Sequence, residues 1–143
     1  MNDLLTTRPP SATAPQPGPL EVLLHTPIPE VVLVRVSGEL DAATAPVLAA
    51  QTARQLRRGP HIVIDLAGVP FLGVRGLDIL RALQEQATAT GAQVHLAAPH
   101  HAVRRPLRLS GLDQLLPTDS SAEMIIARLT VRCWTRSTPT GGA

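Results

Sequence analysis

Four short apolar runs alternate along the chain with longer segments whose apolar residues recur every three or four positions. The runs cover residues 20–25, 31–36, 62–66 and 93–98. Runs of this length rich in β-branched side chains are typical of buried strands, whereas the longer period indicates amphipathic helices. The pattern therefore predicts alternating strands and helices, which favours a mostly parallel or mixed sheet with helices layered on it.

The helical segments have recognisable boundaries. They are predicted at residues 45–58, 74–90, 103–109 and 121–129. Gly59-Pro60 ends the first and Gly91 the second, because glycine favours a helix end and proline cannot continue a helix. Asp119 or Ser120 is expected to cap the last helix, with Glu123 in its first turn.

The two ends of the chain differ from its middle. Residues 1–19 hold five prolines and show no periodicity, so they bury too little apolar surface to fold and are predicted to be a disordered leader. Residues 20–129 are predicted to form one domain, and residues 130–143 a flexible tail. Cys133, in that tail, is the one cysteine and cannot form an internal disulfide; a redox role for it stays open.

Composition narrows the possible partners. The 143 residues include one Phe, one Trp and no Tyr, so the chain lacks the aromatic side chains on which single-stranded nucleic acids stack. All thirteen basic residues are arginine, yet the formal net charge is only +2, too small for a nucleic-acid interface. The sequence has no apolar run of membrane-spanning length and no signal-peptide pattern, so we expect no direct membrane insertion and a cytoplasmic location.

No catalytic motif is recognisable. The sequence has no Gly-rich phosphate loop, nucleophile elbow or Cys/His constellation, which predicts a protein that is not an enzyme and needs no cofactor. The five histidines show no metal-ligand spacing; His100-His101 follows a strand, but a metal site there is disfavoured. Asp65 ends a buried strand, and we expect its carboxylate to accept a bond from a following N–H rather than to act in catalysis.

The most informative segment is IVIDLAGVPFLGVRG, residues 62–76. It reads as a buried strand, a short loop and the start of an amphipathic helix. Loops that follow the carboxyl end of a strand are where open α/β sheets bind ligands and partners. The functional surface is therefore expected near Gly73–Gly76.

Several segments together resemble a known family. The segment 62–77 is similar to part of the STAS domain of bacterial anti-sigma-factor antagonists. The similarity lies in a strand that ends in Asp65-Leu66 and is followed by Phe71-Leu72 and Gly76-Leu77. The turn Gly38-Glu39-Leu40-Asp41, the strand at 93–98 with its following proline, and the segment 103–112 match further elements of that family in order. The resemblance extends from about residue 20 to residue 129.

This resemblance implies a fold, a function and a surface. The fold would be an α/β, STAS-like mixed sheet of four or five strands with about four helices packed largely on one face. The protein would be a regulatory binding module whose partner is a serine-kinase-like anti-sigma factor or a related regulatory protein. A homodimer is compatible with this resemblance. The implied partner-binding residues are Asp41, Thr44, Gly73, Val74, Arg75, Gly76 and Asp78.

One position departs from the family pattern. Family members carry Asp-Ser-Ser-Gly or Asp-Ser-Thr-Gly where this chain has Gly73-Val74-Arg75-Gly76, so Arg75 occupies a degenerate phosphoacceptor position. Phosphorylation at the usual site should therefore not control binding. Two interpretations of Arg75 stay open, recognition of an acidic partner or decay of the site, and Asp41 could cap the following helix, contact the partner or do both.

Two other functions also remain open. The chain could be a STAS-like accessory subunit of an ABC-type membrane transporter. It could instead be a small-ligand sensor that uses the same loop edge.

Overall fold

The computed structural model describes residues 20–57 and 60–137. Within these residues, strands and helices alternate after an initial pair of strands, as the sequence pattern predicts. In chain order the elements are β1 (Glu21–Ile28), β2 (Val31–Ser37), α1 (Ala45–Gln55), β3 (His61–Gly68), α2 (Val74–Thr90), β4 (Gln93–Ala97), α3 (His101–Leu109), α4 (Leu112–Leu115), β5 (Thr118–Asp119) and α5 (Ala122–Ser137). None of these helices has the length and apolar character of a membrane span.

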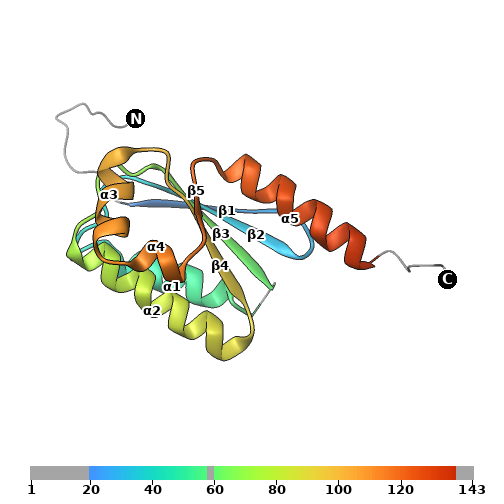
Figure 1. Cartoon of the computed structure of the whole chain (residues 1–143). Helices are drawn as coiled ribbons and strands as arrows, with labels where there is room; N and C mark the ends of the chain where they lie inside the picture. The colour runs from blue at the N-terminus through green and yellow to red at the C-terminus, as the bar shows by residue number, and fades with distance from the viewer. Residues whose placement is uncertain (1–19, 58–59, 138–143) are drawn as a thin grey trace, which may run out of the picture.

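The five strands form one mixed sheet in the order β1-β2-β3-β4-β5 (Figure 1). β1 and β2 are antiparallel and are joined by Pro29-Glu30, a connection too short for anything but a hairpin. The other pairs are parallel, because each is joined by a crossover through one or two helices. The carboxyl ends of β2, β3 and β4 consequently lie along the same edge of the sheet.

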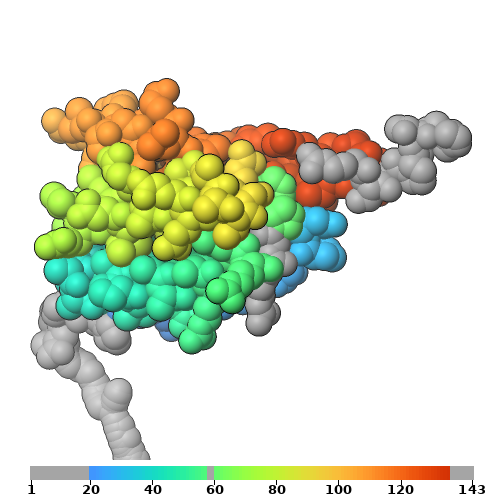
Figure 2. Space-filling view, turned by 90° about the horizontal axis from the view of Figure 1, so that it is seen from below, coloured from blue at the N-terminus to red at the C-terminus, as the bar shows by residue number. Residues whose placement is uncertain are grey.

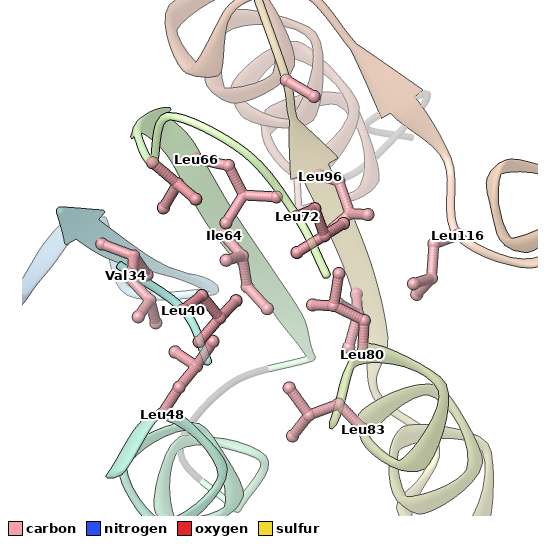
Figure 3. Packing of buried hydrophobic residues seen from close by; sticks show 14 of the residues in the cluster. Val34, Leu40, Leu48, Ile64, Leu66, Leu72, Leu80, Leu83, Leu96 and Leu116 are labelled. Atoms are coloured by element: carbon pink, nitrogen blue, oxygen red, sulfur yellow. The ribbon is translucent and has the colours of Figure 1, made fainter. Parts of the chain in front are cut away.

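Helices cover both faces of the sheet, but unequally. α1 and α2 lie side by side as one layer, with α3 and α4 beside α2, while α5 lies on the opposite face (Figures 1 and 2). Even-numbered strand residues such as Val34 and Ile64 join the larger core under α1–α4, and Figure 3 shows Leu48, Leu80 and Leu83 in the same cluster. Odd-numbered residues form a smaller core with α5. Burial on both faces explains why these strands are continuous apolar runs.

Some predicted boundaries were wrong. β1 does not end at residue 25 but continues through Pro27 to Ile28, which is tolerated because proline can occupy an edge strand. α1 ends at Gln55 rather than residue 58. α4 and β5 were not predicted, since four-residue and two-residue elements are too short to show a period.

The largest correction concerns the C-terminal segment. α5 continues to Ser137, so residues 130–137 are helical where a loose tail was predicted, and Cys133 lies partly buried within the helix. Ser121 caps the helix rather than Asp119 or Ser120, because its Oγ accepts a hydrogen bond from the Met124 amide at 3.1 Å. Residues 138–143 and the predicted leader, 1–19, lie outside the described residues, and the domain boundaries stay predictions.

Candidate functional site

The structure brings the two predicted site segments together at the carboxyl edge of the sheet. Leu40, in the turn after β2, pairs with Leu72, in the loop before α2, through an isolated parallel bridge. Both leucines are buried, at 1% and 5% exposure. The Asp41 turn and the start of α2 are therefore neighbours in space although more than thirty residues separate them in the sequence.

The Asp41 turn is held by a compact set of hydrogen bonds. The Asp41 Oδ1 atom accepts bonds from the amides of Ala43 and Thr44, each at 3.0 Å, as predicted. These bonds hold the turn that precedes α1, because the N-cap of α1 is Thr44 and the helix has no side-chain cap bond. In return, the Thr44 hydroxyl accepts a bond from the Asp41 amide at 2.9 Å and donates one to the Glu39 carbonyl at 2.6 Å. This reciprocal arrangement has the bonding pattern of a capping box, but it lies in the turn just before α1. The bond from the Thr44 amide is the main reason why the pKa of Asp41 lies below its ordinary value.

The start of α2 is fixed by a glycine that fits closely. A Cβ atom at Gly76 would lie 2.5 Å from Cδ1 of Leu72 and 3.1 Å from Cδ2 of Leu40. Gly76 is accordingly buried. Its part in partner binding stays a prediction, and a buried glycine would act there by positioning the helix start. Gly73 differs: it precedes the helix with an extended backbone, makes no side-chain cap, and has room for a Cβ.

The exposed part of this site is apolar with one ion pair. Val74 is 73% exposed and Phe71 is 47% exposed. Arg75 Nη1 lies 3.9 Å from Asp78 Oδ2, one helical turn further on. Such an exposed pair adds little stability, but it places a carboxylate beside the positive charge at the helix start.

The rest of the carboxyl edge is braced by polar contacts. The Asp65 carboxylate accepts a bond from the Ala67 amide at 3.0 Å, as predicted, and lies 3.6 Å from the Arg35 side chain. Arg35 also reaches Glu123 of α5 at 3.6 Å. The His100 ring donates its Nε2–H to the Ala67 carbonyl at 2.8 Å. These contacts fix the loops around the site and bring no second carboxylate or nucleophile to Asp65.

The exposed residues of these segments can be treated as one surface. The surface, which we call the α2 surface, consists of Asp41, Phe71, Val74, Arg75 and Asp78. Within the described residues, no three His, Cys, Asp or Glu side chains are grouped as metal ligands. Phe71 was used in the sequence only to align the loop; its exposure is the feature that sequence reasoning missed, because a phenylalanine after a strand is normally expected in the core.

Comparison with known proteins identifies the family. The family model described as STAS domain matches residues 25–124. This chain belongs to the STAS-domain family. The anti-sigma-F factor antagonist RsfB of Mycobacterium tuberculosis is 35% identical over 85 residues, which is 59% of this chain and 69% of RsfB. These matches confirm the predicted family.

Solved structures agree with this assignment. A crystal structure of an anti-sigma factor antagonist from Mycobacterium paratuberculosis is 38% identical, with a TM-score of 0.64, and covers 76% of this chain and 92% of that one. Unphosphorylated SpoIIAA, another anti-sigma factor antagonist, shares the fold at 21% identity and a TM-score of 0.66, covering 77% of this STAS chain and 96% of SpoIIAA. The predicted fold class and the antagonist type of function are confirmed, and the transporter-subunit alternative is less supported.

Proposed function

We propose that this STAS domain is an anti-sigma-factor antagonist that binds its partner through the α2 surface and is not switched off by phosphorylation there. The partner would be a serine-kinase-like anti-sigma factor, and the location the cytoplasm. The observation that carries the proposal is the pairing of Leu40 with Leu72, which joins the Asp41 turn and the start of α2 into one surface. Relatives named as anti-sigma-factor antagonists support the partner class.

The chemistry of the α2 surface explains the expected lack of a switch. The first amides of a helix have no intrahelical acceptor, and the helix dipole makes this end partially positive, so a phosphorylated hydroxyl would be well placed here. Arg75 supplies no hydroxyl and adds a positive charge instead. Its unfavourable interaction with the dipole is offset by Asp78 at 3.9 Å. The same residue can meet a carboxylate on the partner.

The apolar residues of the surface suit a protein partner. Exposed aromatic and aliphatic side chains beside an arginine resemble the centre of a protein–protein interface, where such residues provide most of the affinity. Phe71 and Val74 lie on both sides of Gly73, whose lack of a side chain leaves the backbone between them accessible. A partner with an apolar contact and a nearby carboxylate would fit this arrangement.

The test is to measure binding of a serine-kinase-like anti-sigma factor by isothermal titration calorimetry, before and after incubation with ATP. We expect the same affinity in both cases. Arg75→Glu should weaken binding by about 2 kcal/mol or more, roughly thirtyfold, if the arginine meets a carboxylate in the complex. Arg81→Glu is the matched control, because it reverses an exposed charge on the same helix outside the α2 surface.

Two outcomes would contradict the proposal. Stoichiometric phosphate on residues 74–76 after incubation with ATP would show that a switch is present. Equal losses from Arg75→Glu and Arg81→Glu would show that binding responds to overall charge and not to the α2 surface. The expected compatibility with a homodimer is a separate prediction, which light scattering during size-exclusion chromatography tests.

A further inference from the structure

A polar hollow lies at the end of the sheet opposite to the α2 surface. It has a volume of about 550 Å³, within the range of small-molecule sites. Its polar lining comes from β3, α2, β4, α4 and α5, through His61, Gln84, Thr88, Gln93, Gln114 and Arg132. We call it the β4-edge hollow.

The sheet topology explains why this hollow exists. β5 has only two residues and pairs with β4 only at Leu96 and Ala97. The first part of β4, from Gln93 to His95, therefore has an uncovered outer edge. Because α2 and α5 lie on opposite faces of the sheet, the hollow is lined from both faces, by Gln84 and Thr88 of α2 and by Arg132 of α5. The amides of Leu96 and Ala98 point to the β5 side, and the two-residue alternation of a strand directs the Val94 amide the same way.

The lining has a definite chemistry. Arg132 is the one charged side chain among the described residues of the lining, and no carboxylate is present there. Arg132 also forms no ion pair within residues 20–57 and 60–137. Three glutamine amides can both donate and accept hydrogen bonds. An arginine without a carboxylate, next to several amides, favours a ligand that has one oxyanion group and other polar atoms.

His61 lines the hollow, and a second buried histidine, His95, lies against it. His61 Nδ1 and His95 Nε2 are 3.3 Å apart, and the two rings are 8% and 4% exposed. Burial, followed by the nearby His61, Arg128 and Arg132, lowers the pKa of His95 to about 4, so this ring is neutral at neutral pH. His95 thus adds no fixed charge beside the hollow at neutral pH. An oxyanion near Arg132 would change the field at both rings.

We propose that the β4-edge hollow binds a small polar molecule with one carboxylate or phosphate group. Arg132 would pair with the oxyanion, and Gln93 and Gln114 would bond to the remaining polar atoms. The negative end of the α2 dipole also faces this hollow, which places the oxyanion on the α5 side. The site is distinct from the loop edge at which a ligand sensor was considered from the sequence.

The experiment is an NMR titration of the full chain with inorganic phosphate and, separately, with succinate, at constant ionic strength. We expect saturable shifts of the Gln93 and Gln114 amides with at least one probe. The His61 and His95 ring resonances should follow the same curve. His100 and His101, at the other end of the sheet, are internal controls and should not move.

The matched variants are Arg132→Gln and Arg105→Gln. Both remove an exposed arginine that has no ion pair among the described residues, but only Arg132 lines the hollow. Loss of a charge-assisted hydrogen bond should weaken binding of the probe about tenfold to a hundredfold in Arg132→Gln and leave it unchanged in Arg105→Gln. Partner binding should be unaffected in both variants, since the hollow is remote from the α2 surface.

Three results would overturn the assignment. The first is the absence of saturable shifts with either probe. The second is shifts of His100 and His101 that are as large as those of His61 and His95, which would indicate general ion binding. The third is an affinity that Arg132→Gln does not change.

Discussion

The close packing of Gly76 leads to a prediction opposite to the usual effect of glycine in a helix. Replacing a helical glycine by alanine normally stabilises a protein by about 1 kcal/mol. At position 76 the new methyl group would lie 2.5 Å from Leu72 Cδ1 and 3.1 Å from Leu40 Cδ2. Both leucines are buried, so neither side chain can move away freely.

The expected size follows from these two effects. Overpacking a well-packed core costs about 1–3 kcal/mol, and contact on two sides places Gly76 towards the upper end of that range. After the gain in helix propensity, Gly76→Ala should lower the free energy of unfolding by about 1–2 kcal/mol. The shift of the helix start should also weaken partner binding through the α2 surface.

The assay is urea unfolding followed by far-ultraviolet circular dichroism, which gives the free energy of unfolding and its denaturant dependence. Gly73→Ala is the control, because a methyl group at position 73 meets only Phe71, at 4.0 Å. This variant should remain within about 0.5 kcal/mol of the parent chain, as is usual for a change that creates no strain. A Gly76→Ala protein as stable as the parent would refute the packing argument.

Three further predictions concern charge. Asp41→Ala should lower the urea midpoint at neutral pH, because the Ala43 and Thr44 amides lose their acceptor. Since folding lowers the pKa of Asp41, the stability that its carboxylate contributes is present above the ordinary pKa of 3.8. The difference in urea midpoint between the variant and the parent should therefore shrink as the pH falls below 3.8. The pKa of His95 falls from 6.5 to about 4 on folding, so the contribution of His95 to the free energy of unfolding should be fully present above pH 6.5. The free energy of unfolding should drop by about 3 kcal/mol as the pH falls to 4. Urea unfolding of His95→Gln should show a weaker dependence of this free energy on pH. Arg75→Ser should gain phosphate from a partner kinase, and an unchanged intact mass after incubation with ATP would count against the alignment of position 75.

The regular elements could be predicted because their signals are local. α2 was predicted with its correct bounds, since Gly91 adopts the left-handed conformation that ends a helix and the apolar residues repeat regularly before it. The central strands were also found, because burial on both faces makes them continuous apolar runs.

The missed elements depend on contacts that sequence patterns do not contain. β5 exists because the Leu96 and Ala98 amides bond to the carbonyls of Pro117 and Asp119, and α4 because Leu112 and Leu116 are buried. The meeting of His61 with His95 follows from the register of β3 on β4. No local feature of either histidine signals it.

The location of the site could be predicted from the sequence, but the exposure and the contacts of its side chains could not. The Asp41 turn and the start of α2 were both assigned from motifs, whereas the exposure of Phe71 and the pairing of Arg75 with Asp78 are tertiary facts. The bonds of Asp41 to the Ala43 and Thr44 amides were foreseen because they join residues two and three positions apart.

These tertiary facts bear on whether the altered site has decayed or recognises a partner. A site that had only lost its phosphoacceptor would have no physical reason to keep Val74 at 73% exposure and Phe71 at 47% on the same rim, because exposed apolar area adds nothing to folding and promotes aggregation. Gly76, closely packed beneath that rim, is required for folding in either case and holds the helix start in place. A rigid base under an apolar rim that holds one arginine is what a binding surface requires, and this favours recognition by Arg75 over decay.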